Sequence, residues 1–130
     1  MEVLSSRVLL APSDLAAAIR WYTEVLGLRV YREYGEGGTI TGVVLFLGGG
    51  YLELTGPRAG STAGPGVSLW LQTVDVETEH ERLRVAGVTV LAAPERMPWG
   101  LVECWVADPD GTRLCLVEVP EDHPIRRRIQ

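Results

Sequence analysis

The fold is decided by a segment that occurs twice, SDLAAAIRWYTEVLGLRV at residues 13–30 and DVETEHERLRVAGVTV at residues 75–90. In each copy an aspartate suited to the N-cap opens a stretch of helix formers, and a glycine suited to the left-handed C-terminal position closes it. The aspartate precedes the glycine by thirteen residues in the first copy and by twelve in the second. The spacing predicts helices over 15–26 and 76–86.

Short apolar runs flank each predicted helix, one before it and three after it, as expected for strands. The first half has predicted strands at 8–11, 28–34, 39–47 and 51–55, and the second half at 67–73, 88–92, 101–107 and 112–119. The order strand, helix and three strands therefore occurs twice. The simplest account is a duplicated unit, which predicts an α+β fold of two tandem βαβββ modules.

The length and composition predict a single domain, residues 1–130, because 130 residues with 46% hydrophobic side chains suffice for a compact core. A stretch rich in Gly, Pro, Ala and Ser indicates a surface linker between the modules. Module 1 is expected at about 4–55, the linker at 56–65, module 2 at about 66–119 and a tail at 120–130.

Charge and hydropathy exclude several classes of partner. The formal charge is −5, and the only dense basic cluster, Arg126 to Arg128, falls in the tail, so nucleic acid is not expected as a partner. No run of about 18 apolar residues and no signal-like start occur, so we expect a cytoplasmic protein without membrane contact. All twelve basic residues are arginine, which excludes lysine Schiff-base chemistry.

Several short motifs in the two halves carry a family resemblance. They are Asp14-Leu15, Trp21-Tyr22, Val25-Leu26-Gly27-Leu28, Trp99-Gly100 and Asp108-Pro109-Asp110-Gly111. Through them the chain resembles the vicinal oxygen chelate superfamily, which includes glyoxalase I, bleomycin resistance proteins and extradiol dioxygenases. The resemblance covers nearly the whole chain and implies mixed sheets that curl around a cavity, usually within a homodimer.

Metalloenzymes of this family chelate a divalent ion with residues from the first and last strand of each half, commonly His and Glu. By motif spacing the matching positions here hold Arg7, Glu53, Ser68 and Cys115. A guanidinium has no lone pair to offer a metal, and only one carboxylate remains. Against the family pattern, we therefore expect no metal, no cofactor and no metal-dependent catalysis of the usual family type.

Arg7 suggests a replacement for the ion, because a guanidinium close to Glu53 would balance the charge of a buried carboxylate. We predict an Arg7–Glu53 ion pair. The alternative is that Arg7 extends to solvent at the end of its strand.

Side chains along a strand point alternately to its two faces. The residues two positions away from Arg7, Glu53, Ser68 and Cys115 should therefore lie on the same face as these four. In the last hairpin a two-residue turn would set Cys104 opposite Cys115, whereas a three-residue turn with Gly111 left-handed would set Trp105 there. We favour the second, which leaves the two thiols on opposite faces and unbridged. The predicted ligand-binding residues are Arg7, Tyr51, Glu53, Ser68, Trp70, Gln72, Trp99, Glu103, Trp105 and Cys115, and no catalytic residue is predicted.

Three functions fit these observations. The first is metal-independent binding or sequestration of an aromatic or amphipathic small molecule, similar to the bleomycin resistance branch; the acidic total charge mildly favours a cationic ligand. The second is an enzyme of the family's isomerase, lyase or dioxygenase branches with an atypical site, using Glu53 as a base and Cys115 as a thiol. The third is a structural dimerisation module, in which the aromatic residues fill a core.

Overall fold

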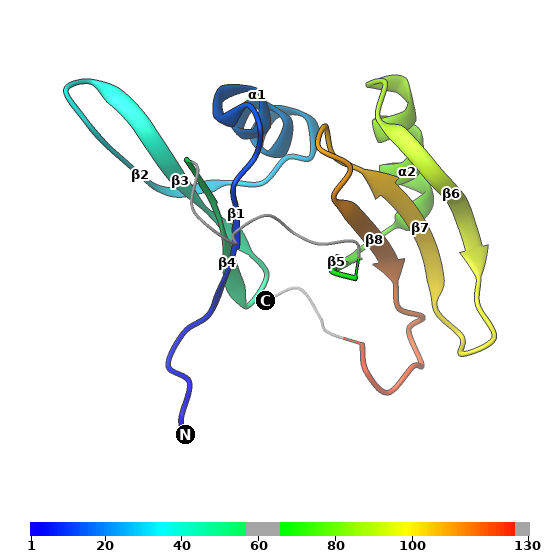
Figure 1. Ribbon diagram of the computed structural model, residues 1–130. Coiled ribbons are helices and arrows are strands. Elements are labelled where there is room, and N and C mark those ends of the chain that lie inside the picture. Colours follow the sequence, from blue (N-terminus) through cyan, green and yellow to red (C-terminus); the bar gives the residue numbers. More distant parts are fainter. Residues whose placement is uncertain (57–65, 127–130) are drawn as a thin grey trace. The chain divides into compact units, whose positions relative to one another are not determined.

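The structure is a computed structural model that describes residues 1–56 and 66–126. The chain divides into two compact units, residues 1–64 and 65–130, and each is described by itself. Each unit contains a four-stranded mixed sheet and a helix (Figure 1), so the predicted α+β fold with two tandem modules is confirmed. The predicted linker lies outside the described residues except for Gly56, as do residues 127–130 of the predicted tail.

In the first unit the sheet has the order β1-β4-β3-β2. Its elements are β1 (Arg7–Leu10), α1 (Leu15–Arg20), the π-helical turn η1 (Trp21–Val25), β2 (Val30–Glu36), β3 (Thr39–Leu47) and β4 (Gly50–Thr55). Strand β1 is parallel to β4, and the other pairs are antiparallel. The last strand of the module therefore lies in the middle of the sheet, next to the first.

The second unit repeats this topology with the order β5-β8-β7-β6 and a parallel β5–β8 pair. Its elements are β5 (Ser68–Thr73), α2 (Val76–Val85), β6 (Thr89–Arg96), β7 (Val102–Ala107) and β8 (Arg113–Glu118). Strand β6 ends at Arg96, four residues beyond its predicted end, and it includes Pro94. The sheet accommodates this proline because β6 is an edge strand and needs no hydrogen bond on its outer side.

The helix starts follow the sequence prediction, because the side chains of Asp14 and Asp75 accept hydrogen bonds from the backbone of Ala17 and Thr78. The bond from Thr78 also lowers the pKa of Asp75. The end of the first helix differs from the prediction, since the α-helix stops at Arg20 and continues as a π-helical turn. The Thr23 hydroxyl donates to the carbonyl of Ile19 at 2.7 Å, which competes with the regular helical bond there.

The core of each unit lies between its helix and one face of its sheet. In the first unit α1 packs against β3 and β4. In the second unit α2 packs against β6, β7 and β8. The buried side chains on the helix-facing sides of the sheets include Val43, Leu45, Leu52 and Leu54 in the first unit and Cys104, Val106 and Leu114 in the second, where Leu83 of α2 is also buried. Strand alternation consequently directs a second set of side chains to the face opposite each helix.

The turn of the last hairpin is held by Asp108, whose carboxylate accepts hydrogen bonds from the backbone of Asp110 at 2.9 Å and Thr112 at 2.8 Å. Gly111 has a φ of 84°, and the register pairs Trp105 with Cys115. The predicted three-residue turn is thereby confirmed. Both thiols are free and lie on opposite faces of the sheet, since Cys104 pairs with Leu116.

Replacing Asp108 by alanine is expected to lower the free energy of unfolding by about 1–2 kcal/mol, because two backbone N–H groups lose their acceptor. Urea denaturation measures this change. Asp110, whose side chain is exposed in the same turn, provides the control, and Asp110→Ala should change stability by less than about 0.5 kcal/mol. Equal losses for the two variants would contradict the role given to Asp108.

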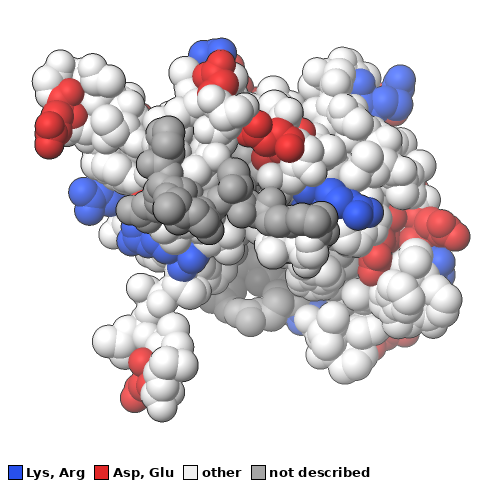
Figure 2. Space-filling model, viewed as in Figure 1, with Lys and Arg blue, Asp and Glu red and all other residues white. Residues whose placement is uncertain are grey.

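Charged side chains are distributed over the described surface. In the view of Figure 2, basic side chains occur in several separate places with acidic ones between them. Of the predicted basic cluster 126–128, only Arg126 is described; it donates to the carbonyl of Val119 and pairs with Glu121 at 3.1 Å. None of the described helices is long and apolar enough to cross a membrane.

Candidate functional site

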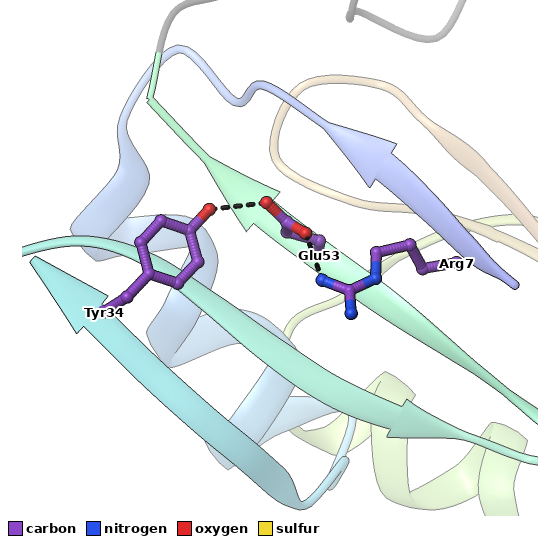
Figure 3. A network of polar contacts seen from close by, with 3 residues as sticks. All are labelled: Arg7, Tyr34 and Glu53. Atoms are coloured by element: carbon purple, nitrogen blue, oxygen red, sulfur yellow. Dashed lines mark hydrogen bonds and ion pairs between the residues drawn. The ribbon is translucent and has the colours of Figure 1, made fainter. Parts of the chain in front are cut away.

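A polar network of three side chains crosses the sheet of the first unit (Figure 3). Arg7 on β1 donates from Nη1 to Oε1 of Glu53 on β4 at 2.7 Å, and the hydroxyl of Tyr34 on β2 donates to Oε2 at 2.5 Å. The predicted Arg7–Glu53 ion pair is therefore confirmed. The side chain of Glu53 is 9% exposed and that of Arg7 is 41% exposed. The carboxylate is thus buried between two donors that approach from opposite sides.

The sequence prediction missed Tyr34, which reaches Glu53 across the intervening strand β3. It can do so because its partner on β3 is Gly42, which has no side chain. A Cβ atom on Gly42 would lie 2.2 Å from Cζ and from the hydroxyl oxygen of the Tyr34 ring. A glycine inside a predicted strand is the signal that could have indicated this close approach.

Replacing Tyr34 by phenylalanine is expected to lower the free energy of unfolding by about 1.5–3 kcal/mol, because a buried carboxylate loses a hydrogen bond. The matched control is Tyr31→Phe, since Tyr31 is half exposed and its hydroxyl has no hydrogen-bond partner among the described residues. Urea denaturation of both variants compares the two losses. Equal stability of the variants would show that the Tyr34–Glu53 bond contributes nothing.

Three aromatic rings lie beside this network on the face opposite α1. Tyr31 stacks on Tyr51 with ring centroids 4.9 Å apart and contacts Phe46 at 5.2 Å. Tyr31 is 50% exposed and Phe46 is 38% exposed. Tyr51 belongs to the predicted site, and Tyr31 and Phe46 were not predicted. A bulge between Val30 and Arg32 displaces Tyr31 onto this face, which a regular alternation would not place there.

In the second unit the predicted residues share the face opposite α2. The register sets Trp70 beside Cys115 and Cys115 beside Trp105 in one row across β5, β8 and β7. Ser68 and Gln72 lie two residues to either side of Trp70 on β5, and they share its face. Trp105 packs against a buried cluster, whereas Trp70 is 50% exposed.

A second carboxylate, Glu103 on β7, is buried on this face. Its Oε2 accepts a hydrogen bond from the indole N–H of Trp99 at 2.9 Å. Trp99 lies in the turn before β7 rather than on a strand, and this bond brings it to the other predicted residues. Burial raises the pKa of the Cys115 thiol to about 12, and the neighbouring Glu103 adds to the effect. Cys115 is consequently a neutral thiol at physiological pH and a poor nucleophile.

The residues at the four ligand positions that the family resemblance implies do not fit a divalent ion. Arg7 is a protonated donor bound to Glu53, and Cys115 offers no thiolate, the form of cysteine that binds metals. Residues 1–56 and 66–126 contain no group of three or more His, Cys, Asp or Glu side chains able to hold a metal. Ser68, the fourth position, is a neutral hydroxyl.

Comparisons with known proteins agree with this fold. The family model described as Glyoxalase/Bleomycin resistance protein/Dioxygenase superfamily matches residues 5–116. A search of curated proteins found no match.

Several solved structures are similar. A member of the glyoxalase/bleomycin resistance protein/dioxygenase superfamily from Sphaerobacter thermophilus is 27% identical, with a TM-score of 0.75, over 90% of this chain and 98% of that chain. TioX from Micromonospora sp. ML1 is 26% identical, with a TM-score of 0.74, over 91% and 100% of the two chains. TnmS3 from Streptomyces sp. CB03234, described as an antibiotic binding protein, has a TM-score of 0.77 over 92% and 98%. At 23% identity TnmS3 shows the shared fold alone.

Proposed function

Since the chain belongs to the glyoxalase/bleomycin resistance protein/dioxygenase superfamily, we propose that it binds a small aromatic or amphipathic molecule without a metal. The main support is the Arg7–Glu53–Tyr34 network, in which an ion pair stands at two positions where the family resemblance leads us to expect metal ligands. Exposed aromatic rings lie directly beside it. Aromatic walls with a few fixed polar groups are the usual means of holding such ligands.

The relatives add support to this proposal. TnmS3 is described as an antibiotic binding protein, and its fold extends over 92% of this chain. For this protein we propose a related role, and each unit is considered by itself: the proposed contact residues of each lie on the face of its sheet opposite its helix, or in the turn beside that face. The residues proposed to contact a ligand are Arg7, Tyr51 and Glu53 in the first unit and Ser68, Trp70, Gln72, Trp99, Glu103, Trp105 and Cys115 in the second.

The alternative of thiol chemistry finds no support in the geometry. Burial, with the charge of the neighbouring Glu103, raises the pKa of the Cys115 thiol to about 12, which leaves almost no thiolate at neutral pH. Glu53 has hydrogen bonds to both carboxylate oxygens, from Arg7 and Tyr34, instead of an oxygen directed at a substrate. Binding requires neither a nucleophile nor a base.

A thermal-shift screen in the presence of a chelator tests the proposal. The panel contains planar aromatic natural products, amphipathic molecules and aliphatic controls of matched size. A ligand that binds only the folded state stabilises it by about 2.7 kcal/mol at a hundredfold excess over Kd. We expect at least one aromatic compound to raise Tm in the chelator. Curves that shift for no compound, or only after a divalent ion is added, would contradict metal-independent binding.

A further inference from the structure

Two arginines bracket the aromatic rings of the first unit. The Cζ atom of Arg7 lies 6.0 Å from the centroid of Tyr51, and that of Arg29 lies 5.6 Å from the centroid of Phe46. Tyr31 contacts both rings between them. We call these five residues the Arg–aromatic surface. It consists of three adjoining π-systems with a guanidinium at each end.

The charge of this surface differs from that of the whole chain. Glu53 offsets Arg7, but in residues 1–56 and 66–126 Arg29 forms no ion pair. Arg32 lies on the same side of the sheet, since it pairs with Val44 and Val44 pairs with Glu53. Locally the face therefore carries an excess of positive charge, although the chain as a whole has a formal charge of −5.

The guanidinium groups also keep donors available. Arg7 donates only through Nη1 to a described residue, and no described side chain accepts a hydrogen bond from Arg29. A guanidinium presents five N–H donors in one plane, in a geometry that matches carboxylate oxygens. The exposed rings of Tyr31 and Phe46 provide stacking area next to these donors.

We propose that the Arg–aromatic surface recognises planar aromatic anions, with the ring system on Tyr31 and Phe46 and a carboxylate or similar acceptor against Arg29. This inference rests on the proposed function and specifies its ligand class. The inferred preference for an anion is opposite to the preference for a cation that the total charge predicted. A bound ligand interacts mainly with charges within about a Debye length, and not with the sum over the chain.

Three anthracene probes with different charges test this inference: anthracene-9-carboxylate, 9-anthracenemethanol and 9-(aminomethyl)anthracene. Fluorescence anisotropy titrations with the full chain give a Kd for each. We expect the carboxylate to bind at least about tenfold more tightly than the ammonium at low salt, and the difference to shrink in high salt. The neutral alcohol should fall between them.

Two variants test whether Arg29 causes the preference for the carboxylate probe. Arg29→Gln should weaken binding of the carboxylate about fivefold and leave the alcohol nearly unchanged. Arg20→Gln makes the same charge change on helix α1, where Arg20 is exposed, and should leave all three affinities unchanged. Circular dichroism of both variants verifies that the comparison is between folded proteins.

The results of these titrations distinguish a failure of the anionic preference from a failure of the proposed function. Tight binding of the ammonium, or equal effects of Arg29→Gln and Arg20→Gln, would overturn the anionic preference and leave aromatic binding intact. Failure of all three probes would overturn the assigned surface, and a flat thermal-shift screen would then remove the proposed function as well. If a second copy of the chain covers the surface, Tyr31→Ala would lower the mass measured by light scattering and no probe would bind, which also overturns the inference.

Discussion

Replacing Gly42 by valine is expected to lower the free energy of unfolding by about 3 kcal/mol, although valine is favoured in strands. The valine Cβ would occupy the space of the Tyr34 ring, since a Cβ atom there lies 2.2 Å from ring atoms. The ring must move away and release Glu53, so the loss combines steric strain with a broken hydrogen bond to a buried carboxylate. Urea denaturation measures the change.

The control for Gly42→Val is the same substitution in a Tyr34→Ala background. Without the ring no collision occurs, and the additional cost of the valine should fall below about 1 kcal/mol. A double-mutant cycle of these four proteins gives the coupling between the two positions. Additive effects would contradict the close approach of Tyr34 over Gly42.

Alkylation of Cys115 in the folded protein is expected to be at least about a thousandfold slower than in the unfolded protein at pH 7.5. The thiol pKa is raised from 9.0 to about 12, and three units correspond to a factor of about 10³ in thiolate. Mass spectrometry of a Cys104→Ala variant, with and without urea, follows iodoacetamide labelling of the remaining thiol. Labelling rates within tenfold of each other would restore Cys115 as a candidate nucleophile.

The same pKa shift predicts the direction of a stability change with pH. Because the folded thiol has a higher pKa than the unfolded thiol, its contribution to stability is complete below about pH 9 and is lost as the pH rises toward 12. Comparing Cys115→Ala with the parent protein at pH 7.5 and pH 10 isolates this contribution. The parent protein should lose more stability over this interval than the variant does.

Local signals were sufficient to predict most of the fold. The caps Asp14 and Asp75 and the apolar runs placed both helices and all eight strands, and Pro109-Asp110-Gly111 determined the register of the last hairpin. These features are encoded within a few residues of one another, so a single sequence contains them. The Arg7–Glu53 pair followed from the resemblance together with charge balance.

The missed features depend on irregular backbone. A bulge brings Tyr31 onto the face of Phe46, and Tyr34 reaches Glu53 only because the register aligns it with Gly42. One-residue shifts of this kind move a side chain to the other face, and no periodicity indicates where a bulge occurs. The π-helical turn after Arg20 was likewise hidden behind a regular helical pattern.

We propose that an aromatic small molecule binds at the face of the Arg7–Glu53–Tyr34 network without a metal. The most direct test of this claim is calorimetric titration of the most stabilising compound from the screen, with and without a chelator, against the parent protein and a Tyr51→Ala variant. We predict an affinity that the chelator leaves unchanged and that Tyr51→Ala lowers about tenfold or more. Loss of binding in the chelator, or an unchanged affinity in Tyr51→Ala, would contradict the claim.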